Sequence, residues 1–279
     1  MKIRLAAAVA PVALALLATP AFAQEETKPI TVSGSAALVS DYRFRGVSQS
    51  DRAMAVQAGA TIAHESGLYV GTWASNLSGW GTFGGSNTEL DLIGGYKKDF
   101  NGVTLDVGLT WYMYPGGADK TDFAEPYVKV SGTAGPVSLL AGVAYAPKQE
   151  ALGKWYNSGA AYATGVPNNP GAKDDNLYIW TDMSTGIPDT GLTLRAHVGY
   201  SDGNPGLGPN GTSVAPTGKY LDWNIGADYA IGPVVLGVSY IDTDISKAES
   251  AYLLPNFSST KDGSPISGAA VVVSGTIAF

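Results

Sequence analysis

Twelve stretches of the chain, each about ten residues long, alternate apolar and polar side chains. In the stretch 103–114, one face of an extended strand would carry only large apolar side chains: Val103, Leu105, Val107, Leu109, Trp111 and Met113. Successive side chains of a β-strand point to opposite faces, so the pattern predicts strands with one apolar and one polar face. Soluble sandwiches and membrane barrels both contain such strands, and the alternation alone does not choose between them.

The N-terminal segment indicates export. Lys2 and Arg4 precede an apolar run, residues 5–18, and small residues follow at Ala21 and Ala23. The run is too short to span a bilayer, so the order of charged, apolar and small residues predicts a cleaved secretory signal peptide, residues 1–23. The mature chain, residues 24–279, is then expected to form a single barrel domain.

The other end of the chain finishes a strand on an aromatic residue. Val271, Val273, Ile277 and Phe279 share one face of the stretch 267–279. A last strand that ends in an aromatic residue resembles the assembly signal of bacterial outer-membrane proteins, which implies contact with the barrel-assembly machinery through Phe279. Together with an export signal, this strand favours a barrel in the bacterial outer membrane over a soluble sandwich.

Composition excludes several classes of function. The chain has no cysteine, which excludes thiolate metal sites, cysteine catalysis and disulfides. Removing Lys2 and Arg4 leaves 15 basic against 24 acidic residues, and a net charge of −9 argues against nucleic acid as a partner. No apolar stretch of the mature chain is long enough for a transmembrane helix, so strands alone would contact lipid.

The predicted strands are joined by connections that alternate between short and long. Turns rich in Gly, Pro, Asn and Asp are expected at 65–67, 99–102, 132–135, 186–190 and 231–232, and longer segments at 147–175, 202–218 and 244–266. Bacterial barrels have an even strand count and short periplasmic turns. Twelve strands place both termini and all five turns on one side, while ten or fourteen stay open if a loop hides a hairpin. The expected strands are 30–44, 53–64, 67–75, 88–98, 103–114, 123–131, 136–146, 176–184, 191–201, 219–230, 233–243 and 267–279.

Aromatic residues gather near the ends of the predicted strands. In a membrane barrel, Trp and Tyr concentrate at the two interfaces with water, so we expect an aromatic girdle at the outer rim, with Tyr42 and Phe44 facing lipid. Pro126 lacks an N–H for the ladder and is also expected near the rim. The other aromatics of the expected outer girdle are Trp73, Trp111, Tyr114, Phe123, Tyr145, Tyr178, Trp180, Tyr200, Tyr220, Trp223 and Tyr240.

Two segments carry a resemblance to a known family. They are residues 41–51, with the sequence DYRFRGVSQSD, and residues 69–76, with the sequence YVGTWASN. Both are similar to signature segments of the TorF-type porins, a proteobacterial family of conserved hypothetical proteins. The resemblance implies an outer-membrane channel of unassigned substrate over the whole mature chain, and it brings no catalytic residues.

Charged side chains on the polar phase of the strands are candidates for the lining of a pore. Barrel width grows with strand number, and twelve strands lie between a filled barrel of about eight and an open channel of about sixteen. We therefore expect an all-β, transmembrane antiparallel β-barrel around a narrow, water-filled channel for small hydrophilic solutes, with lipid outside. Arg43 and Arg45 are expected on the lumen face near the outer rim. The other candidates are Glu89, Asp91, Asp106, Lys129, Arg195, His197, Asp222 and Asp228.

Two other functions stay open, an outer-membrane hydrolase acting on lipid and a plugged structural or adhesive barrel. A serine nucleophile needs a base such as His, and the chain has only His64 and His197. His64 is expected near the periplasmic end of its strand and His197 on the lumen face, so neither suits an enzyme of the outer leaflet. Segments 79–84 and 199–203 match short nucleotide and hydrolase motifs, but neither joins a strand to a helix. We expect no enzyme, metal or cofactor.

Overall fold

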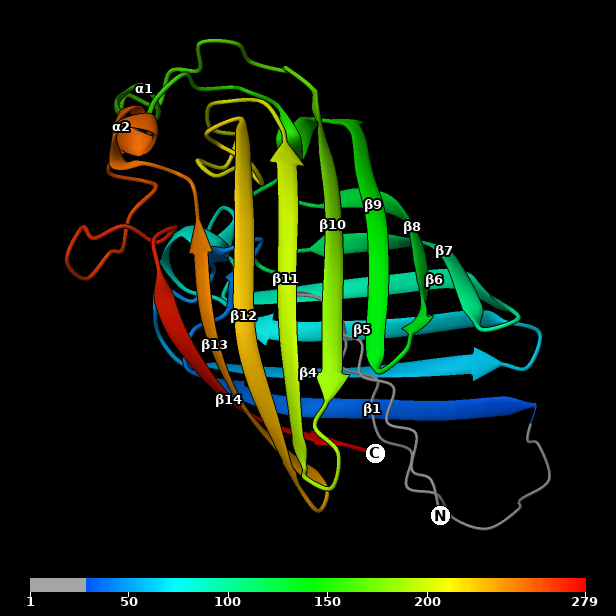
Figure 1. The fold of residues 1–279 in the computed structure, drawn as a ribbon. Helices are drawn as coiled ribbons and strands as arrows, with labels where there is room; N and C mark the ends of the chain where they lie inside the picture. Colours follow the sequence, from blue (N-terminus) through cyan, green and yellow to red (C-terminus); the bar gives the residue numbers. More distant parts are fainter. Residues whose placement is uncertain (1–28) are drawn as a thin grey trace.

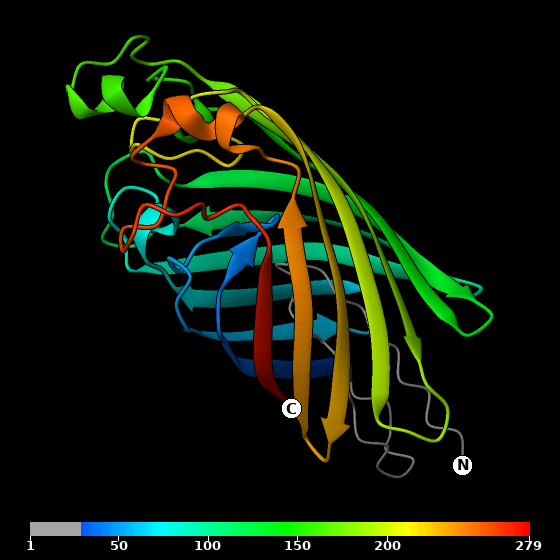
Figure 2. The same ribbon diagram turned by 60° about the vertical axis from the view of Figure 1, so that its left-hand side comes forward.

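The computed structural model describes residues 29–279, and in this part of the chain twelve strands form one closed antiparallel barrel (Figures 1 and 2). The predicted fold class and strand number are confirmed. The predicted signal peptide, residues 1–23, lies outside the described residues. The barrel strands are β1 (Ile30–Val39), β4 (Ala55–His64), β5 (Leu68–Asn76), β6 (Thr88–Phe100), β7 (Val103–Met113), β8 (Phe123–Ala134), β9 (Val137–Gln149), β10 (Asp174–Gly186), β11 (Leu192–Asp202), β12 (Lys219–Ile231), β13 (Val234–Thr243) and β14 (Ala270–Ala278).

Backbone hydrogen bonds between the first and last strands close the ring. The N–H of Gly34 donates to the carbonyl oxygen of Phe279 at 2.8 Å, and the N–H of Phe279 donates to that of Gly34 at 3.0 Å. The Phe279 ring covers Gly34, where a Cβ would come within 2.7 Å of the ring. Because β1 pairs with both β4 and β14, the barrel has no free edge with unpaired backbone groups, as a hydrocarbon environment requires.

Large apolar side chains cover the outside of the barrel. On β12, Leu221, Ile225 and Tyr229 are 41%, 66% and 50% exposed, and the polar residues between them face inward. A soluble sandwich buries its apolar face, whereas a membrane barrel turns it to lipid. The exterior is therefore that of a membrane-spanning barrel. Other exposed apolar residues on the strands are Val32, Val56, Val70, Leu92, Val107, Trp111, Val128, Val143, Ile179, Val198, Val238 and Val273.

The connections at the two ends of the barrel differ in length. At one end, the turn end, five tight turns join neighbouring strands at the predicted places. One of them is Asn101-Gly102, in which both φ angles are positive (56° and 90°), as the preferred two-residue hairpin turn requires. The opposite end is the loop end. Its loops are residues 40–54, 77–87, 114–122, 150–173, 203–218 and 244–269.

Short helices occur only in loop-end connections of the described chain. Figure 2 shows α1 (Gly159–Ala163) and α2 (Lys247–Ser250) close together above the loop end. Three short 3₁₀ helices also lie in loop-end connections: η1 (Gly79–Thr82), η2 (Glu150–Leu152) and η3 (Ala251–Leu253). Within residues 29–279, no helix is long and apolar enough to cross a membrane.

Pro126 lies near the loop end of β8, as predicted. Backbone pairing between β8 and β9 begins only at Tyr127. Beyond that point the side-chain amide of Gln149 takes the place of a strand, because it accepts a hydrogen bond from the N–H of Ala124 at 2.8 Å and donates one to its carbonyl oxygen at 2.9 Å. A side chain thus completes the ladder where proline cannot.

The predicted strand 30–44 is wrong beyond Val39. Residues 40–54, the inserted segment, leave the wall and form a small hairpin of β2 (Arg43–Phe44) and β3 (Val47–Ser48) inside the barrel. The turn of this hairpin is Arg45-Gly46, with φ angles of 48° and 78°. Asn-Gly is the usual sequence signal for a turn with two positive φ angles, and arginine is uncommon there. The sequence Arg-Gly therefore did not predict this turn.

The expected outer girdle is only partly correct. Trp111, Tyr145 and Tyr240 are 45–48% exposed on the outer face, as predicted. Tyr42 and Trp73, by contrast, are buried inside the barrel. Tyr42 is buried because the inserted segment leaves the wall at residue 40. For Trp73 strand parity decides, because residues of opposite phase near one rim face opposite sides of the wall. The other expected girdle residues that point inward are Phe44, Tyr114, Phe123, Tyr178, Trp180 and Tyr220.

A charge on the lipid face should destabilise the barrel according to its depth. Ile225 lies at the middle of β12, so Ile225→Arg is expected to lower the free energy of unfolding by about 2–4 kcal/mol. Leu221→Arg, on the same face near the loop end, should cost only about 0–1 kcal/mol. Urea unfolding in phospholipid vesicles measures both variants. Equal costs at the two positions would contradict the assigned membrane depth.

Candidate functional site

The inserted segment places Arg45 among buried charged side chains inside the barrel. We call this group the charged layer, and its members are Arg43, Arg45, Glu89, Asp91 and Glu125. Nη2 of Arg45 donates to both carboxylate oxygens of Glu125 on β8, at 2.7 Å each. The guanidinium carbon lies 4.1 Å from the ring centre of Tyr178 on β10. Both charged side chains of the pair are 4% exposed. Such a pair holds the segment in place, because removing either partner leaves a charge where water does not reach it.

Arg43 fixes the shape of the inserted segment itself. Its Nε donates to Asp41 at 2.8 Å, and its Nη1 donates to the carbonyl oxygens of Gly46 and Gly268 at 2.9 and 2.7 Å. Asp41 also accepts a hydrogen bond from the hydroxyl of Ser48 at 2.6 Å. Arg43 therefore ties the two arms of the hairpin to each other and to the loop 244–269.

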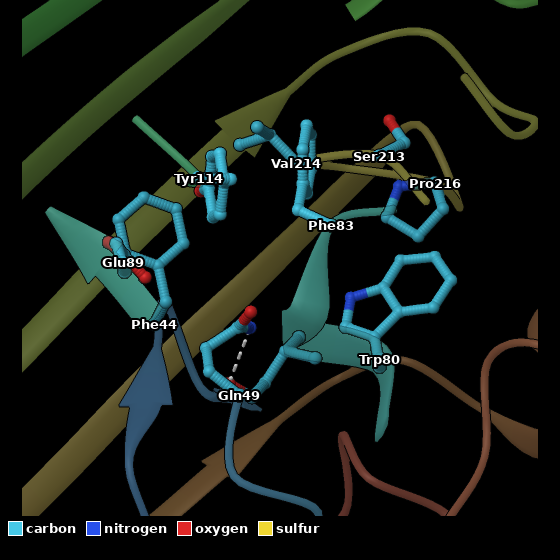
Figure 3. Close-up of a pocket in the computed structure, with 10 residues that line it drawn as sticks. Phe44, Gln49, Trp80, Phe83, Glu89, Tyr114, Ser213, Val214 and Pro216 are labelled. Atoms are coloured by element: carbon cyan, nitrogen blue, oxygen red, sulfur yellow. Dashed lines mark hydrogen bonds between the residues drawn. The ribbon is translucent and has the colours of Figure 1, made fainter. Parts of the chain in front are cut away.

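Two carboxylates of β6 face the same layer. Glu89 accepts hydrogen bonds from the hydroxyl of Tyr42 at 3.1 and 3.2 Å. Asp91 is fully buried, and among the described residues neither of its oxygens has a hydrogen-bond partner. Glu89 also lines a cavity of about 20 Å³, bounded by Phe44 and Trp80, that has room for one water molecule (Figure 3). The cavity can therefore supply Glu89 with a water molecule, whereas Asp91 keeps two unsatisfied acceptors.

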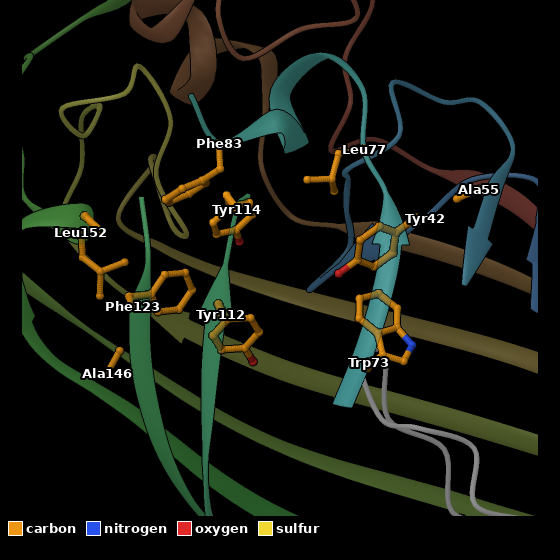
Figure 4. Packing of buried hydrophobic residues seen from close by; sticks show 11 residues of the cluster. Tyr42, Ala55, Trp73, Leu77, Phe83, Tyr112, Tyr114, Phe123, Ala146 and Leu152 are labelled. Atoms are coloured by element: carbon orange, nitrogen blue, oxygen red, sulfur yellow. The ribbon is translucent and has the colours of Figure 1, made fainter. Parts of the chain in front are cut away.

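Aromatic rings fill the rest of the layer (Figure 4). Tyr42 packs edge-on against Trp73 with ring centres 5.3 Å apart, and Phe44 packs in the same way against Tyr112 at 5.8 Å. Tyr112 in turn stacks on Phe123 at 4.6 Å. The inserted segment and the wall that it contacts therefore fill the loop-end half of the barrel.

His197 on β11 is held by two carboxylates and a tyrosine. Its Nδ1 lies 2.6 Å from Asp182, and its Nε2 lies 3.2 Å from Asp222 and 2.9 Å from the hydroxyl of Tyr178. Both ring nitrogens are engaged, and no serine hydroxyl is among these contacts. The cluster is therefore a buried polar network in which neither ring nitrogen is free to act as a base.

The second histidine, His64, lies at the turn end, as predicted. Its Nδ1 lies 2.9 Å from the hydroxyl oxygen of Ser66 and accepts a hydrogen bond from the backbone N–H of the same residue at 3.1 Å. Both residues are exposed in the tight turn between β4 and β5. These contacts are local contacts within an exposed turn.

The turn-end half of the interior carries ion pairs that water reaches. Lys129 Nζ lies 3.4 Å from an oxygen of Asp106 on the neighbouring strand, and Arg195 Nε lies 3.0 Å from Asp228. These four side chains are 13–23% exposed, in contrast to the charged layer. Opposite charges are neighbours here and do not face each other across the lumen.

Aromatic rings of this half lie flat against the wall, because glycines make room for them. Tyr69 lies directly across from Gly95, and Trp180 directly across from Gly142. A Cβ at Gly95 would lie 2.7 Å from Cζ of Tyr69, and a Cβ at Gly142 would lie 2.3 Å from Cζ2 of Trp180. An inward glycine beside an aromatic residue of the next strand lets the ring cover the backbone. The rings therefore take little of the width of the lumen.

The inserted segment is also anchored at the loop end through Asp51. Its carboxylate accepts hydrogen bonds from the backbone N–H of Thr260, at 3.0 Å, and from the Thr260 hydroxyl. Burial on its own would raise the pKa of Asp51, but hydrogen bonds from Thr260 and Ser259 and the charge of Lys261 outweigh it and hold the pKa below its usual value. The stability that this anchor contributes is complete above the unfolded-state pKa and is lost as the pH falls through the lowered folded-state pKa.

All ten pore-lining candidates point into the barrel and form three groups, two of which meet at Tyr178. Their part in conduction stays a prediction. Tyr42 and Tyr178, predicted in the outer girdle, belong to these groups instead, as does Asp182, which was not among the candidates. Among residues 29–279, no group of three or more His, Cys, Asp or Glu side chains is arranged to hold a metal ion. The groups are the charged layer with Arg43, Arg45, Glu89 and Asp91, the network with His197 and Asp222, and the hydrated pairs of Asp106 with Lys129 and Arg195 with Asp228.

Residues 23–270 match the family model described as "Bacterial protein of unknown function (Gcw_chp)". The chain belongs to this family. The match supports a bacterial family without an assigned function and does not extend to the TorF name. No curated protein matches the chain at a significant level.

Solved structures of outer-membrane proteins resemble the fold at a distance. The outer membrane protein OpdK from Pseudomonas aeruginosa is 13% identical with a TM-score of 0.43, and the alignment covers 92% of this chain and 68% of that one. OmpF of Salmonella typhi is 12% identical with a TM-score of 0.42, covering 90% and 97%. A porin refined at 1.8 Å is 12% identical with a TM-score of 0.40, covering 90% and 100%. At these scores the similarities add nothing about function.

Removing one side of the Arg45–Glu125 pair should destabilise this member of the Gcw_chp family. Arg45→Met leaves Glu125 buried without its partner, and we expect a loss of about 3–5 kcal/mol in the free energy of unfolding. The double variant Arg45→Met/Glu125→Gln should recover most of that loss, because no buried charge is left alone. Urea unfolding in detergent micelles, followed by tryptophan fluorescence, measures both.

The matched control is Lys219→Met, which removes an exposed pair with Asp202, where the side chains are 67% and 36% exposed. This variant should leave the unfolding midpoint unchanged, since exposed pairs contribute little. If Arg45→Met is no more destabilising than Lys219→Met, the buried pair does not hold the inserted segment.

Proposed function

We propose that the protein is a channel of the bacterial outer membrane for small hydrophilic solutes, and that the inserted segment is its constriction. The observation that carries the proposal is the division of the interior into a filled, charged layer and a half that water reaches. Charges in a hydrated lumen determine which solutes pass. The rings held flat by glycines leave the space that such passage needs.

The orientation follows from the lengths of the connections. Bacterial barrels keep short turns in the periplasm and long loops outside, so the turn end faces the periplasm and the loop end faces the medium. The apolar exterior contacts lipid, and small hydrophilic solutes occupy the lumen. Phe279, which is 75% exposed at the end of the closing strand, presents the C-terminal signal to the barrel-assembly machinery. The proposal assigns no catalytic step to the protein.

A closed structural barrel is the second candidate, and the buried layer favours it. Arg45 and Glu125 are nearly inaccessible, and the cavity beside Glu89 holds about one water molecule. If the inserted segment never moves, ions do not pass. A lipid hydrolase is not favoured, because both ring nitrogens of His197 are already engaged.

Removing the inserted segment should enlarge the channel. Val39 and Ala55 are paired directly, so replacing residues 41–53 by Asn-Gly gives a two-residue hairpin turn in the existing register. We expect discrete conductance steps for the wild type in planar bilayers and steps several-fold larger for this variant. As a control, replacing residues 158–167, which contain α1 above the loop end, by Gly-Gly should leave conductance unchanged. A wild type and a variant that are both silent would leave the closed barrel as the better account.

Neutralising the two members of a hydrated ion pair should shift ion selectivity in opposite directions. Lys129→Gln removes a positive charge from the lumen and should move the reversal potential in a salt gradient toward cation preference. Asp106→Asn, at the other end of the same 3.4 Å contact, should move it toward anion preference. Each variant loses the same interaction, so a common folding defect would not produce shifts of opposite sign. Identical reversal potentials would place this pair outside the conduction path.

A further inference from the structure

The loop end contains a cleft that the charged layer does not use. Its volume is about 430 Å³, within the range of about 300–1,000 Å³ that small-molecule sites occupy. Four loops build its walls, 77–87, 150–173, 203–218 and 244–269, so segments distant in sequence converge on it. Because the cleft lies beyond the strands, its occupant would meet the protein from the medium.

The cleft lining is polar but uncharged. Of the described residues that line it, none is acidic or basic, although the whole chain carries a net charge of −7. The lining combines amides and hydroxyls, such as those of Asn210, Thr212 and Asn256, with glycine backbone. Such a surface donates and accepts hydrogen bonds without a preference for either sign of charge. A neutral ligand rich in hydroxyl groups fits it better than an ion.

Asn210 holds an unused hydrogen-bond donor in this lining. Its Oδ1 accepts from the backbone N–H of Thr212 at 3.0 Å and from the Thr212 hydroxyl at 2.7 Å, which fixes the orientation of the amide. Its Nδ2 is buried and has no partner among the described residues, and the residue is only 6% exposed. A buried donor without an acceptor is unfavourable, and an oxygen atom that reaches it from the cleft would satisfy it.

Two aromatic residues line the same cleft. Tyr162 packs over Gly211, where a Cβ would lie 2.5 Å from its ring, and it meets the ring of Tyr156 edge-on at 5.0 Å. Trp80 is held edge-on against Phe257 at 4.8 Å. Trp80 is buried, so the ring that remains accessible is that of Tyr162, and a ring fixed in this way offers a rigid apolar surface at small entropic cost. The C–H face of a sugar ring is the part of a hydroxyl-rich ligand that packs on such a surface.

We propose that this cleft is a binding site for an uncharged saccharide, with Asn210 donating to a sugar oxygen and Tyr162 packing against the sugar ring. The site does not rest on the channel proposal, since binding is measurable without a membrane. Trp80 also lines the cavity beside Glu89, so the indole lies between the cleft and the interior of the barrel. Free sugars and the sugar chains of surface polymers share this chemistry.

Calorimetric titration of the purified full chain tests the proposal. The protein is kept in an amine-oxide detergent, because glucoside and maltoside detergents carry sugar headgroups. The probes are maltose, sucrose and a neutral polysaccharide released from the cell surface, with glucose 6-phosphate and leucine as controls. We expect at least one neutral saccharide to bind and neither control to do so. Binding of the short sugars identifies a free solute, and binding of the polysaccharide alone identifies a surface polymer.

Two pairs of variants locate the binding. Asn210→Asp keeps the acceptor for Thr212 but removes the free donor, and we expect affinity to fall about tenfold, whereas Asn204→Asp, in the same loop but outside the cleft, should leave it unchanged. Tyr162→Ala should abolish binding and Tyr162→Phe should retain it, because the ring is what the sugar contacts. Unchanged unfolding midpoints exclude a folding defect. No saccharide binding by the wild type, or binding unaffected by both Asn210→Asp and Tyr162→Ala, would overturn the proposal.

Discussion

The need to pair every backbone polar group within the chain governs this structure. Lipid offers no hydrogen bonds, so a sheet that contacts it on one face must close on itself. The bonds between Gly34 and Phe279 complete that closure between the first and last strands. Once the outer face is committed to apolar side chains, polar groups are confined to the lumen and the loop end. The charged layer, the hydrated ion pairs and the uncharged cleft all occupy the space that this constraint leaves.

The inserted segment shows how a chain can occupy its own lumen and be held there by specific contacts. Apolar packing alone would make the segment part of a core, but its contacts with the wall also include the buried pair of Arg45 and Glu125 and the polar anchor at Asp51. Buried ion pairs cost desolvation and contribute little net stability, although breaking one side is costly. Such a contact specifies position more than it adds stability. The constriction that we propose needs contacts of this kind, which define the position of the segment without adding much to its stability.

Local periodicity predicted most of the fold, because the alternation of apolar and polar residues in a barrel strand shows which side chains face lipid and which face the lumen. The strands, the five turns and the place of Pro126 follow from spacing and turn chemistry. The inserted segment could not be predicted in this way, because its turn is formed by Arg45-Gly46 and its residues alternate like those of a wall strand. Trp73 was assigned to lipid because aromatic residues near a rim serve either face, and only consistent parity along β5 separates the two. Asp182 and its contact with His197 depend on strand neighbours, which no local pattern reveals.

The flat rings imply that the bore of this barrel is encoded in pairs of residues on adjacent strands. At Tyr69 with Gly95, and at Trp180 with Gly142, one partner supplies bulk and the other supplies the recess that receives it. Adding a single methyl group to the recess would swing the ring toward the barrel axis. Bore size could then be graded by exchanging glycine for alanine at one wall position, with strand number, shear and lipid contact all preserved. In such a protein, the open width of the lumen is set by side chains and can change while the sheet stays the same.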